Sequence, residues 1–261
     1  MTPFDLSKSE QYDLSIRLSA DGFSFSVHHP QDNGGDDVFF NTYPVNASYS
    51  LTANVKEMIA STEALKHSFR KTNILMDTPR FTPVPFDLYE DEPVEAFFHH
   101  NFPKENNEII LCNILGKSNV ALLFGMDKHA HQLLNEHFAS ARFFACVSPL
   151  TEHFTLKSRD SHCRNIYAHL KKETLEVFAF DDKGQLLLIN TFGAKQTADK
   201  VYYLLFVWKQ LGFSQEHDRL WMVGETDEEL SARLRKFLRQ VSVLPQSNHL
   251  PFDIQTLMTC E

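Results

Sequence analysis

Glycine is scarce in this sequence, with 9 residues among 261, about half the usual frequency of roughly 7%. Glycine accepts positive φ and lets a backbone amide come close to a phosphate. The scarcity therefore argues against a nucleotide cradle. The patterns GxGxxG, GxxxxGKS or GxxxxGKT, and GxSxG are all absent, so the common dinucleotide, P-loop and hydrolase motifs are excluded.

Paired cysteines and long apolar runs are also missing. The four cysteines form no CxxC pair, and two of them lie in apolar segments, so we expect buried free thiols in a reducing compartment. The longest apolar runs, such as residues 201–208, are far short of the roughly 20 residues that span a bilayer, and residues 1–11 contain no apolar core. We expect a soluble, cytoplasmic protein without a membrane partner.

Positive charge is in deficit. The 25 Lys and Arg against 34 Asp and Glu give a formal charge of −9, which disfavours nucleic acid as a partner. The densest basic group falls in the last turns of an expected helix, where cations complement the helix dipole. It consists of Arg233, Arg235, Lys236 and Arg239.

The composition is otherwise that of a folded globular chain, with 43% hydrophobic residues and 23 Phe. Apolar and polar residues alternate over 14–18 and 23–27, and the Asp21-Gly22 pair between these runs predicts a hairpin. A third strand is expected near 38–43, a helix over 52–69 and a strand at 74–76. The opening order is strand, strand, strand, helix, strand.

The middle of the chain begins with a proline-rich connection, residues 78–93, which excludes a regular helix and disfavours a central strand. The pattern then predicts a helix at 92–102, a hairpin over 109–115 and 120–124, a helix near 127–139, a strand at 142–147 and a helix near 149–158. We interpret these elements as an extra ββαβα unit.

The last third repeats the opening order. Strands are expected at 164–170, 173–181 and 185–192, a helix over 196–211 before Gly212, and a strand at 220–223. Thr226 and Glu229 have the spacing of a capping box that would start the final helix. The expected divisions are a tail at 1–11, a first half at 12–160, a second half at 161–245 and a tail at 246–261.

A βββαβα order at both ends of one chain resembles the actin-like ATPase superfamily, whose halves have a ribonuclease-H-like fold. The stretch LSIRLSADGFSF at residues 14–25 also looks like an uncharacterised Bacteroidetes family thought to have this fold. The resemblance implies an α/β protein with mixed sheets in two such halves. It covers most of the chain.

Active members of that superfamily hold ATP through an Asp-x-Gly turn in the first hairpin of each half and a glycine pair after a later strand. The corresponding stretches here read Arg17-Leu18-Ser19, residues 169–173 (HLKKE) and Gly224-Glu225. The first two lack the Asp that orients magnesium and the glycine that admits a phosphate, and the third has one glycine in place of two. We therefore expect no catalytic residue, no cofactor site and no ATP hydrolysis.

A two-metal nuclease site, a histidine metal site and a cysteine nucleophile are not expected. Acids with the order of a two-metal nuclease are Asp13, Glu57 or Glu63, and Asp77, but acids are common at strand and helix ends. His129, His131 and His137 do not share one helix face, so no metal site is expected. Cys163 follows His162, but adjacent side chains rarely form a nucleophile and base pair.

The proline-rich connection supplies a candidate partner surface, formed by Phe81, Phe86, Leu88 and Tyr89 beside the acidic residues 90–92. The alternative is that these side chains fold back over the hydrophobic core of the first half. The leading hypothesis is a non-catalytic protein-binding or scaffolding module. The alternatives are a diverged nucleotide-dependent phosphotransferase or ATPase, and a self-associating structural subunit.

Overall fold

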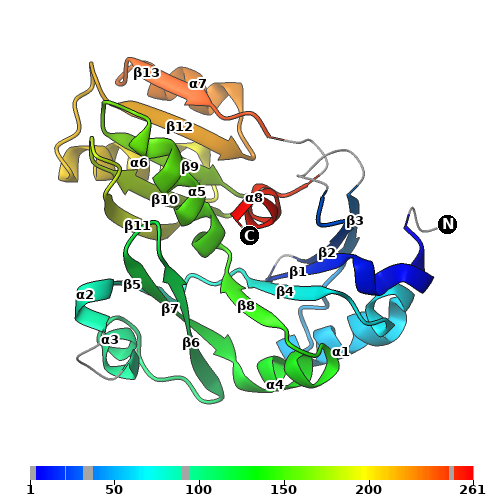
Figure 1. Cartoon of the computed structure of the whole chain (residues 1–261). Coiled ribbons are helices and arrows are strands. Elements are labelled where there is room, and N and C mark those ends of the chain that lie inside the picture. The colour runs from blue at the N-terminus through cyan, green and yellow to red at the C-terminus, as the bar shows by residue number, and fades with distance from the viewer. Residues whose placement is uncertain (1–3, 21, 32–37, 90–93, 247–249, 261) are drawn as a thin grey trace. The chain divides into compact units, whose positions relative to one another are not determined.

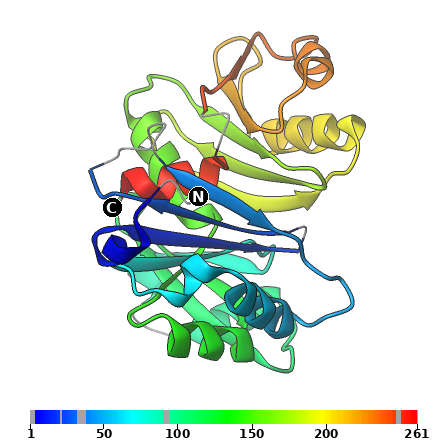
Figure 2. The same ribbon diagram turned by 90° about the vertical axis from the view of Figure 1, so that its right-hand side faces the viewer.

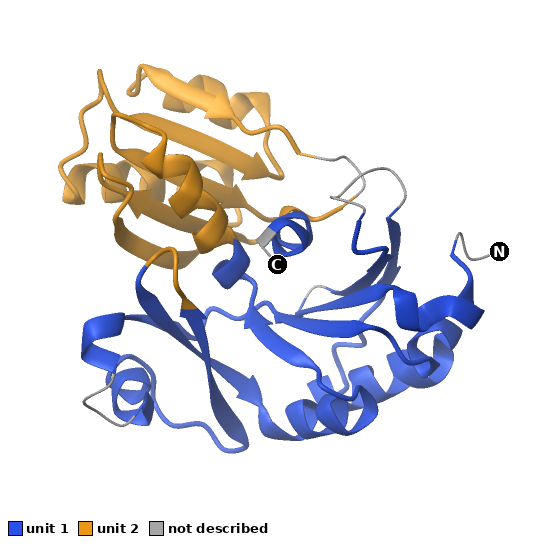
Figure 3. Cartoon of the chain, viewed as in Figure 1, with its two compact units in different colours: residues 1–114, 119–149, 253–261 blue, residues 115–118, 150–252 orange. Residues whose placement is uncertain are grey.

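The computed structural model describes residues 4–20, 22–31, 38–89, 94–246 and 250–260. The chain divides into two compact units (Figures 1 and 3). Unit 1 contains residues 1–114, 119–149 and 253–261, and unit 2 contains residues 115–118 and 150–252. Residues 150–160, expected in the first half, thus cluster with unit 2, and part of the expected C-terminal tail belongs to unit 1.

The first sheet has the order β3-β2-β1-β4-β8. Its strands are β1 (Asp13–Ser19), β2 (Gly22–His28), β3 (Phe39–Tyr43), β4 (Lys71–Met76) and β8 (Arg142–Ala145). β1, β2 and β3 pair antiparallel, whereas β1, β4 and β8 pair parallel. The sequence analysis had placed β8 in an extra unit, but β8 is the fifth strand of this sheet.

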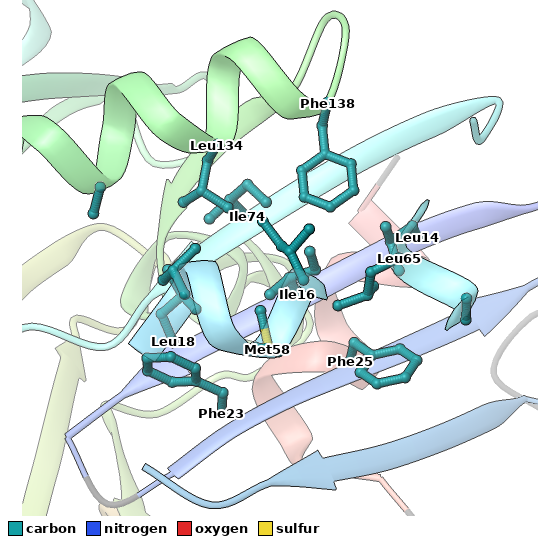
Figure 4. Close-up of a cluster of buried hydrophobic side chains, with 14 of the residues drawn as sticks. Leu14, Ile16, Leu18, Phe23, Phe25, Met58, Leu65, Ile74, Leu134 and Phe138 are labelled. Carbon is teal, nitrogen blue, oxygen red and sulfur yellow. The ribbon is translucent and has the colours of Figure 1, made fainter. Parts of the chain in front are cut away.

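Alternation along β1 and β2 gives the first sheet one apolar face. Leu14, Ile16 and Leu18 are fully buried on it, as the period of two requires. This face packs against α1 (Leu51–Ser61), the 3-10 helix η2 (Glu63–Lys66) and α4 (Lys128–His137) (Figure 4). The expected single helix over 52–69 is interrupted because α1 ends at Ser61 and the next residue, Thr62, has an extended backbone. A further 3-10 helix, η1 (Leu6–Gln11), precedes β1.

A small three-stranded sheet is inserted between β4 and α4. Its order is β5-β7-β6, with β5 (Phe81–Pro85), β6 (Glu108–Leu115) and β7 (Val120–Asp127). The short helices α2 (Phe86–Tyr89) and α3 (Val94–Asn101) follow β5. β5 contains two prolines and occupies an edge, the place in a sheet where a missing N–H is tolerated.

The second sheet repeats the order of the first as β11-β10-β9-β12-β13. The strands are β9 (Asn165–Leu170), β10 (Thr174–Phe180), β11 (Leu186–Gly193), β12 (Arg219–Gly224) and β13 (Gln240–Val243). The three in the order β11-β10-β9 pair antiparallel, and β9, β12 and β13 pair parallel. The prediction of a mixed α/β fold with two related sheets is confirmed.

Helices cover both faces of the second sheet. α6 (Thr197–Gln210) and α7 (Glu228–Leu234) pack on the face that contains Ile166 and Ala168. Phe154 of α5 (Val147–Arg159) stacks on Tyr167, which points to the opposite face, with 4.3 Å between ring centroids. Within the described ranges no helix is long and apolar enough to cross a membrane.

The C-terminal region differs from the expectations in three places. Asp227, not Thr226, caps α7, because its carboxylate accepts a hydrogen bond from the amide of Leu230. The helix ends at Leu234, so the basic group around it spans a helix end and the loop before β13. The expected tail contains α8 (Phe252–Cys260), whose Leu257 packs against Leu75 and Cys146.

Candidate functional site

The first hairpin of unit 1 carries a buried ion-pair cluster at the position where the superfamily resemblance places an Asp-x-Gly turn. Arg17 projects from β1 on the face opposite Leu14 and Ile16. Its Nη2 lies 2.7 Å from Oδ2 of Asp77, and its Nε lies 2.7 Å from Oδ2 of Asp253. Ser19, which stands where the glycine is expected, donates its hydroxyl to Asp77 over 2.9 Å. Arg17 and Ser19 therefore share Asp77.

Three separate elements position this cluster. Asp77 directly follows β4, and its amide donates to the carbonyl of Leu18 over 2.9 Å. That bond continues the parallel pairing of β1 with β4 by one residue, which holds the carboxylate beside Arg17. Asp253 comes from α8, and its side chain is 0% exposed.

Arg17 is held in its charged form by the two carboxylates that it contacts. Burial alone would lower the pKa of Arg17, but the negative charges of Asp253 and Asp77 raise it well above its usual range. The guanidinium is therefore charged at every physiological pH. Two of its three nitrogens donate to these carboxylates, and the Arg17, Asp77 and Asp253 side chains together carry a formal charge of −1.

The first hairpin of unit 2 has a different buried cluster at the corresponding place. Nδ1 of His169 lies 2.7 Å from Oε2 of Glu176, and Nζ of Lys171 lies 2.5 Å from Oε1 of Glu176. Burial alone would raise the pKa of the Glu176 carboxyl, but Lys171 and His169 lower it to about 2. Both carboxylate oxygens of Glu176 are thus occupied by basic partners of its own hairpin.

The third place that the resemblance singles out is the end of β12. Gly224 has a φ of +89°, and a Cβ there would lie 2.3 Å from the carbonyl oxygen of Leu170. The missing side chain thus lets the end of β12 approach the β9 hairpin. The amide of Gly224 donates to Oε1 of Gln246 over 3.0 Å, and the amide of Glu225 donates to Leu170 over 2.8 Å. Both amides are satisfied within the chain.

The nuclease-type acids do not converge. Asp13 begins β1 and binds Arg70 through both carboxylate oxygens, whereas Asp77 follows the far end of β4. The two strands run parallel with Asp13 opposite Lys71, so six residues of extended chain, roughly 20 Å, separate the two acids. Glu63 binds Lys66 on the surface.

The three histidines that were not expected to share one helix face lie in separate environments on α4. His131 packs its ring against Phe143 at 4.4 Å, Nε2 of His137 lies 2.8 Å from the carbonyl oxygen of Leu65, and His129 is exposed. Among the residues that the structure describes, no group of three or more His, Cys, Asp or Glu side chains is arranged to hold a metal ion.

The four candidate partner residues separate by burial. Phe81 is buried in β5, while Phe86 and Tyr89 are half-buried and stack on each other with 6.3 Å between centroids. Leu88 is 54% exposed. The acidic residues 90–92 lie outside the described residues.

Leu88 lines a groove of about 520 Å³ between β5 and α3. Its apolar lining residues are Pro83, Val84, Pro85, Leu88, Ala96 and Phe97, and its polar ones are Thr82, His100 and Asn101. Asp87 and Glu95 are exposed and directly precede the lining residues Leu88 and Ala96. The groove is therefore apolar with acidic neighbours.

Three residues of these sites are not among the site residues expected from the sequence. Asp253 and Gln246 were assigned to a tail, and Glu176 was treated as an ordinary strand residue. The sequence contains one indication of a helix around Asp253, because Leu250, Ile254 and Leu257 have helical spacing. Nothing in the sequence links Asp253 to Arg17, which is 236 positions away.

The family model described as "Protein of unknown function (DUF3822)" matches residues 2–241. The chain belongs to this family. A comparison with curated protein sequences gave no match.

A solved structure from Bacteroides thetaiotaomicron VPI-5482 is 42% identical to this DUF3822 chain, with a TM-score of 0.90 over 99% of both chains. It is described as a protein with actin-like ATPase fold and unknown function. The chain has this actin-like ATPase fold, as the resemblance implied.

More distant structures include the ethanolamine utilization protein EutJ from Carboxydothermus hydrogenoformans. It is 10% identical, with a TM-score of 0.48 over 95% of this chain and 88% of that one. An activator of 2-hydroxyisocaproyl-CoA dehydratase from Clostridium difficile, solved with bound ADPNP, is 7% identical. Its TM-score is 0.46 over 95% of this chain and 93% of that one.

Proposed function

We propose that this DUF3822 protein is a non-catalytic, protein-binding module built on the actin-like fold. The observation that carries the proposal is Arg17, which stands where the resemblance requires the aspartate that orients magnesium. Its guanidinium is bound to Asp77 and Asp253. A cation at this position repels a metal ion, and a guanidinium has no lone pair with which to ligate one.

The carboxylates around Arg17 also disfavour a nucleotide. A guanidinium is a good phosphate ligand when it is available. Here a phosphate would have to displace a carboxylate that is fully buried, and removing one partner from a buried ion pair costs roughly 3–5 kcal/mol. The cluster therefore serves the fold of unit 1.

The end of β12 supports the same proposal from unit 2. A phosphate cradle needs backbone amides that point at the ligand. The amides of Gly224 and Glu225 donate to Gln246 and Leu170 instead. Binding a phosphate there would break two hydrogen bonds and would bring it beside the Glu225 carboxylate.

The groove beside Leu88 is the surface that we assign to the partner. Its apolar floor suits aliphatic side chains, while the exposed Asp87 and Glu95 attract cations. The chain's formal charge of −9 acts in the same direction over longer distances. The partner is therefore a peptide segment that combines aliphatic residues with Lys or Arg.

Calorimetry with ATP and ADP, each with magnesium, tests the non-catalytic part of the proposal. We expect no binding heat and no phosphate release. Micromolar affinity together with turnover would overturn the proposal in favour of a diverged phosphotransferase.

Selection from a phage-displayed peptide library tests the protein-binding part. We expect enrichment of sequences that combine Leu or Ile with Lys or Arg, and loss of that enrichment in Leu88→Asp. Ile114→Asp is the matched control, because Ile114 is 52% exposed on the same small sheet but does not line the groove. Enrichment that is absent, or that survives equally in both variants, would contradict the groove assignment.

A further inference from the structure

Unit 2 carries a continuous row of four aromatic rings that the groove does not involve. Phe192 of β11 stacks on Tyr203 of α6 with 4.6 Å between centroids. Tyr203 meets Tyr202 edge-on at 5.3 Å, and Tyr202 stacks on Phe206 at 6.1 Å. Figure 2 shows α6, drawn in yellow, lying along the second sheet. We call this row the aromatic face.

The outer part of the aromatic face is open to solvent. Tyr202 is 62% exposed and Phe206 is 44% exposed, while Phe192 and Tyr203 are half-buried. Scattered exposed apolar residues need no explanation, but contiguous ones mark interaction sites. Aromatic rings that are already stacked lose little conformational entropy on binding, and Tyr is among the residues that are enriched in interface hot spots.

The edge of the second sheet adjoins the aromatic face. β11 is the terminal strand of its sheet, and in the described ranges it pairs only with β10. Its eight residues, Leu186–Gly193, include no proline and no charged side chain. Natural edge strands are usually protected by such residues, as β5 is by Pro83 and Pro85.

The charged residues of α6 indicate the kind of partner that this surface binds. Asp199, Tyr202, Phe206 and Lys209 follow one another at spacings of three and four residues, so they form one stripe. The acid lies at one end of the stripe, the base lies at the other, and the aromatic residues lie between them. A two-fold axis through the middle of this stripe brings Asp199 opposite Lys209 of a second copy.

We propose that the aromatic face is a homodimer interface in which two copies pair their α6 helices antiparallel. The stripe is then complementary to itself, as an isologous contact requires. Tyr202 of each copy lies opposite Phe206 of the other at the centre, and two Asp199–Lys209 pairs flank them. The unprotected edge of β11 lies at the rim of this contact.

Sedimentation equilibrium of the full chain tests the proposal. We expect a mass of twice the 30.1 kDa of the chain that falls towards 30.1 kDa on dilution. Tyr202→Asp is expected to leave a folded monomer at all concentrations. Leu156→Asp is the matched control, because Leu156 is 42% exposed in the same unit and lies on α5. It should dimerise like the wild type.

Charge exchange tests the antiparallel geometry. Lys209→Glu places two acids opposite each other, and we expect the dissociation constant to rise about tenfold or more. Adding Asp199→Lys should restore the wild-type value, with circular dichroism confirming that α6 remains folded, since Asp199 also accepts the amide of Gln196.

Two results would overturn the proposal. One is a wild-type chain that stays monomeric at the highest attainable concentration, and the other is a dimer that Tyr202→Asp does not disrupt. If the double variant Lys209→Glu, Asp199→Lys is folded but does not regain dimerisation, the antiparallel pairing is excluded. The groove variant Leu88→Asp should leave the mass unchanged, so this proposal and the groove proposal can fail separately.

Discussion

The two units build sheets with the same strand order, and at the end of the first hairpin each buries a cluster of basic and acidic side chains. In unit 1 the basic residue is Arg17 on β1, and its acids come from the residue after β4 and from α8. In unit 2 the basic residues are His169 and Lys171, and Glu176 comes from the neighbouring strand of the same hairpin. The same strand order thus accommodates a cluster formed by residues far apart in the sequence or one formed by residues of a single hairpin.

This difference separates two ways of removing a charge from water. A buried charge is tolerated only when it is paired and hydrogen-bonded. Unit 2 satisfies that need with residues five and seven positions apart, so its cluster forms as soon as the hairpin forms. Unit 1 depends on a helix from the opposite end of the chain. The comparison predicts that changes at the unit 1 cluster have the larger effects.

The largest expected effect is that of Arg17→Met. The substitution leaves the fully buried Asp253 carboxylate without its guanidinium partner, so we expect a loss of about 3–5 kcal/mol in the free energy of unfolding. Urea denaturation gives the magnitude. Hydrogen exchange resolved by peptide should place the loosening in β1, β4 and α8.

Two further variants sharpen that result. Lys66→Met removes an exposed ion pair with Glu63 in the same unit and should change stability little. Adding Asp253→Leu to Arg17→Met should recover part of the loss, because it removes the buried acid that has lost its guanidinium partner. A double variant that is no more stable than Arg17→Met would contradict this account.

Glu176→Gln should cost unit 2 about 3 kcal/mol, at the lower end of the range for a broken buried pair, because the amide oxygen still accepts one hydrogen bond. Exchange protection should fall in β9 and β10. The control is Glu173→Gln in the same hairpin, where the exposed pair with Lys195 contributes little. Equal effects of the two variants would show that the cluster does not stabilise unit 2.

Acid should weaken unit 2 through the same carboxylate. Its pKa is about 2 in the folded chain and 4.5 ordinarily, so its contribution is complete above pH 4.5 and is lost as the pH falls from 4.5 towards 2. The shift corresponds to on the order of 3 kcal/mol. Unfolding curves of the wild type and Glu176→Gln should therefore converge over this interval. Curves that stay parallel would refute the assignment.

Gly224→Ala should destabilise unit 2 by about 2 kcal/mol, since it combines positive φ with a Cβ against the Leu170 carbonyl. Gly116→Ala, also in unit 2, is the control because its Cβ would meet no atom within 4 Å. Thermal denaturation compares them. A stable Gly224→Ala variant would show that β12 can shift, and would reopen this place as a phosphate site.

The smallest expected effects come from the helix caps. Ser50 caps α1 in unit 1 by accepting the amide of Ala53, and Asp227 caps α7 in unit 2 by accepting the amide of Leu230. Each substitution by Ala should cost about 1 kcal/mol. Chemical denaturation should show similar losses, because a cap is a local contact and does not depend on which unit contains it.

Local patterns in the sequence predicted most of the framework. The hairpins around Leu14–Phe25 and Ile166–Val177 and the helices α1, α4, α5 and α6 were found because a period of two or of about 3.6 is written directly in the order of apolar residues. β13 was missed because only Val241 of its four residues is buried, so its sequence shows little apolar pattern. The single capping pattern at Thr226 was misread because Asp227 competes for the same role.

The sequence by itself determined the hairpins that open the two sheets and the residues at the three phosphate-turn positions, because alternation and glycine content are local properties. Only the tertiary structure decided what replaces those turns. Asp253 reaches Arg17 and Gln246 reaches Gly224 across long stretches of chain, and no periodic signal connects such pairs. Their physical cause is that buried charges and amides must find partners, and the fold selects which distant residues are near enough to supply them.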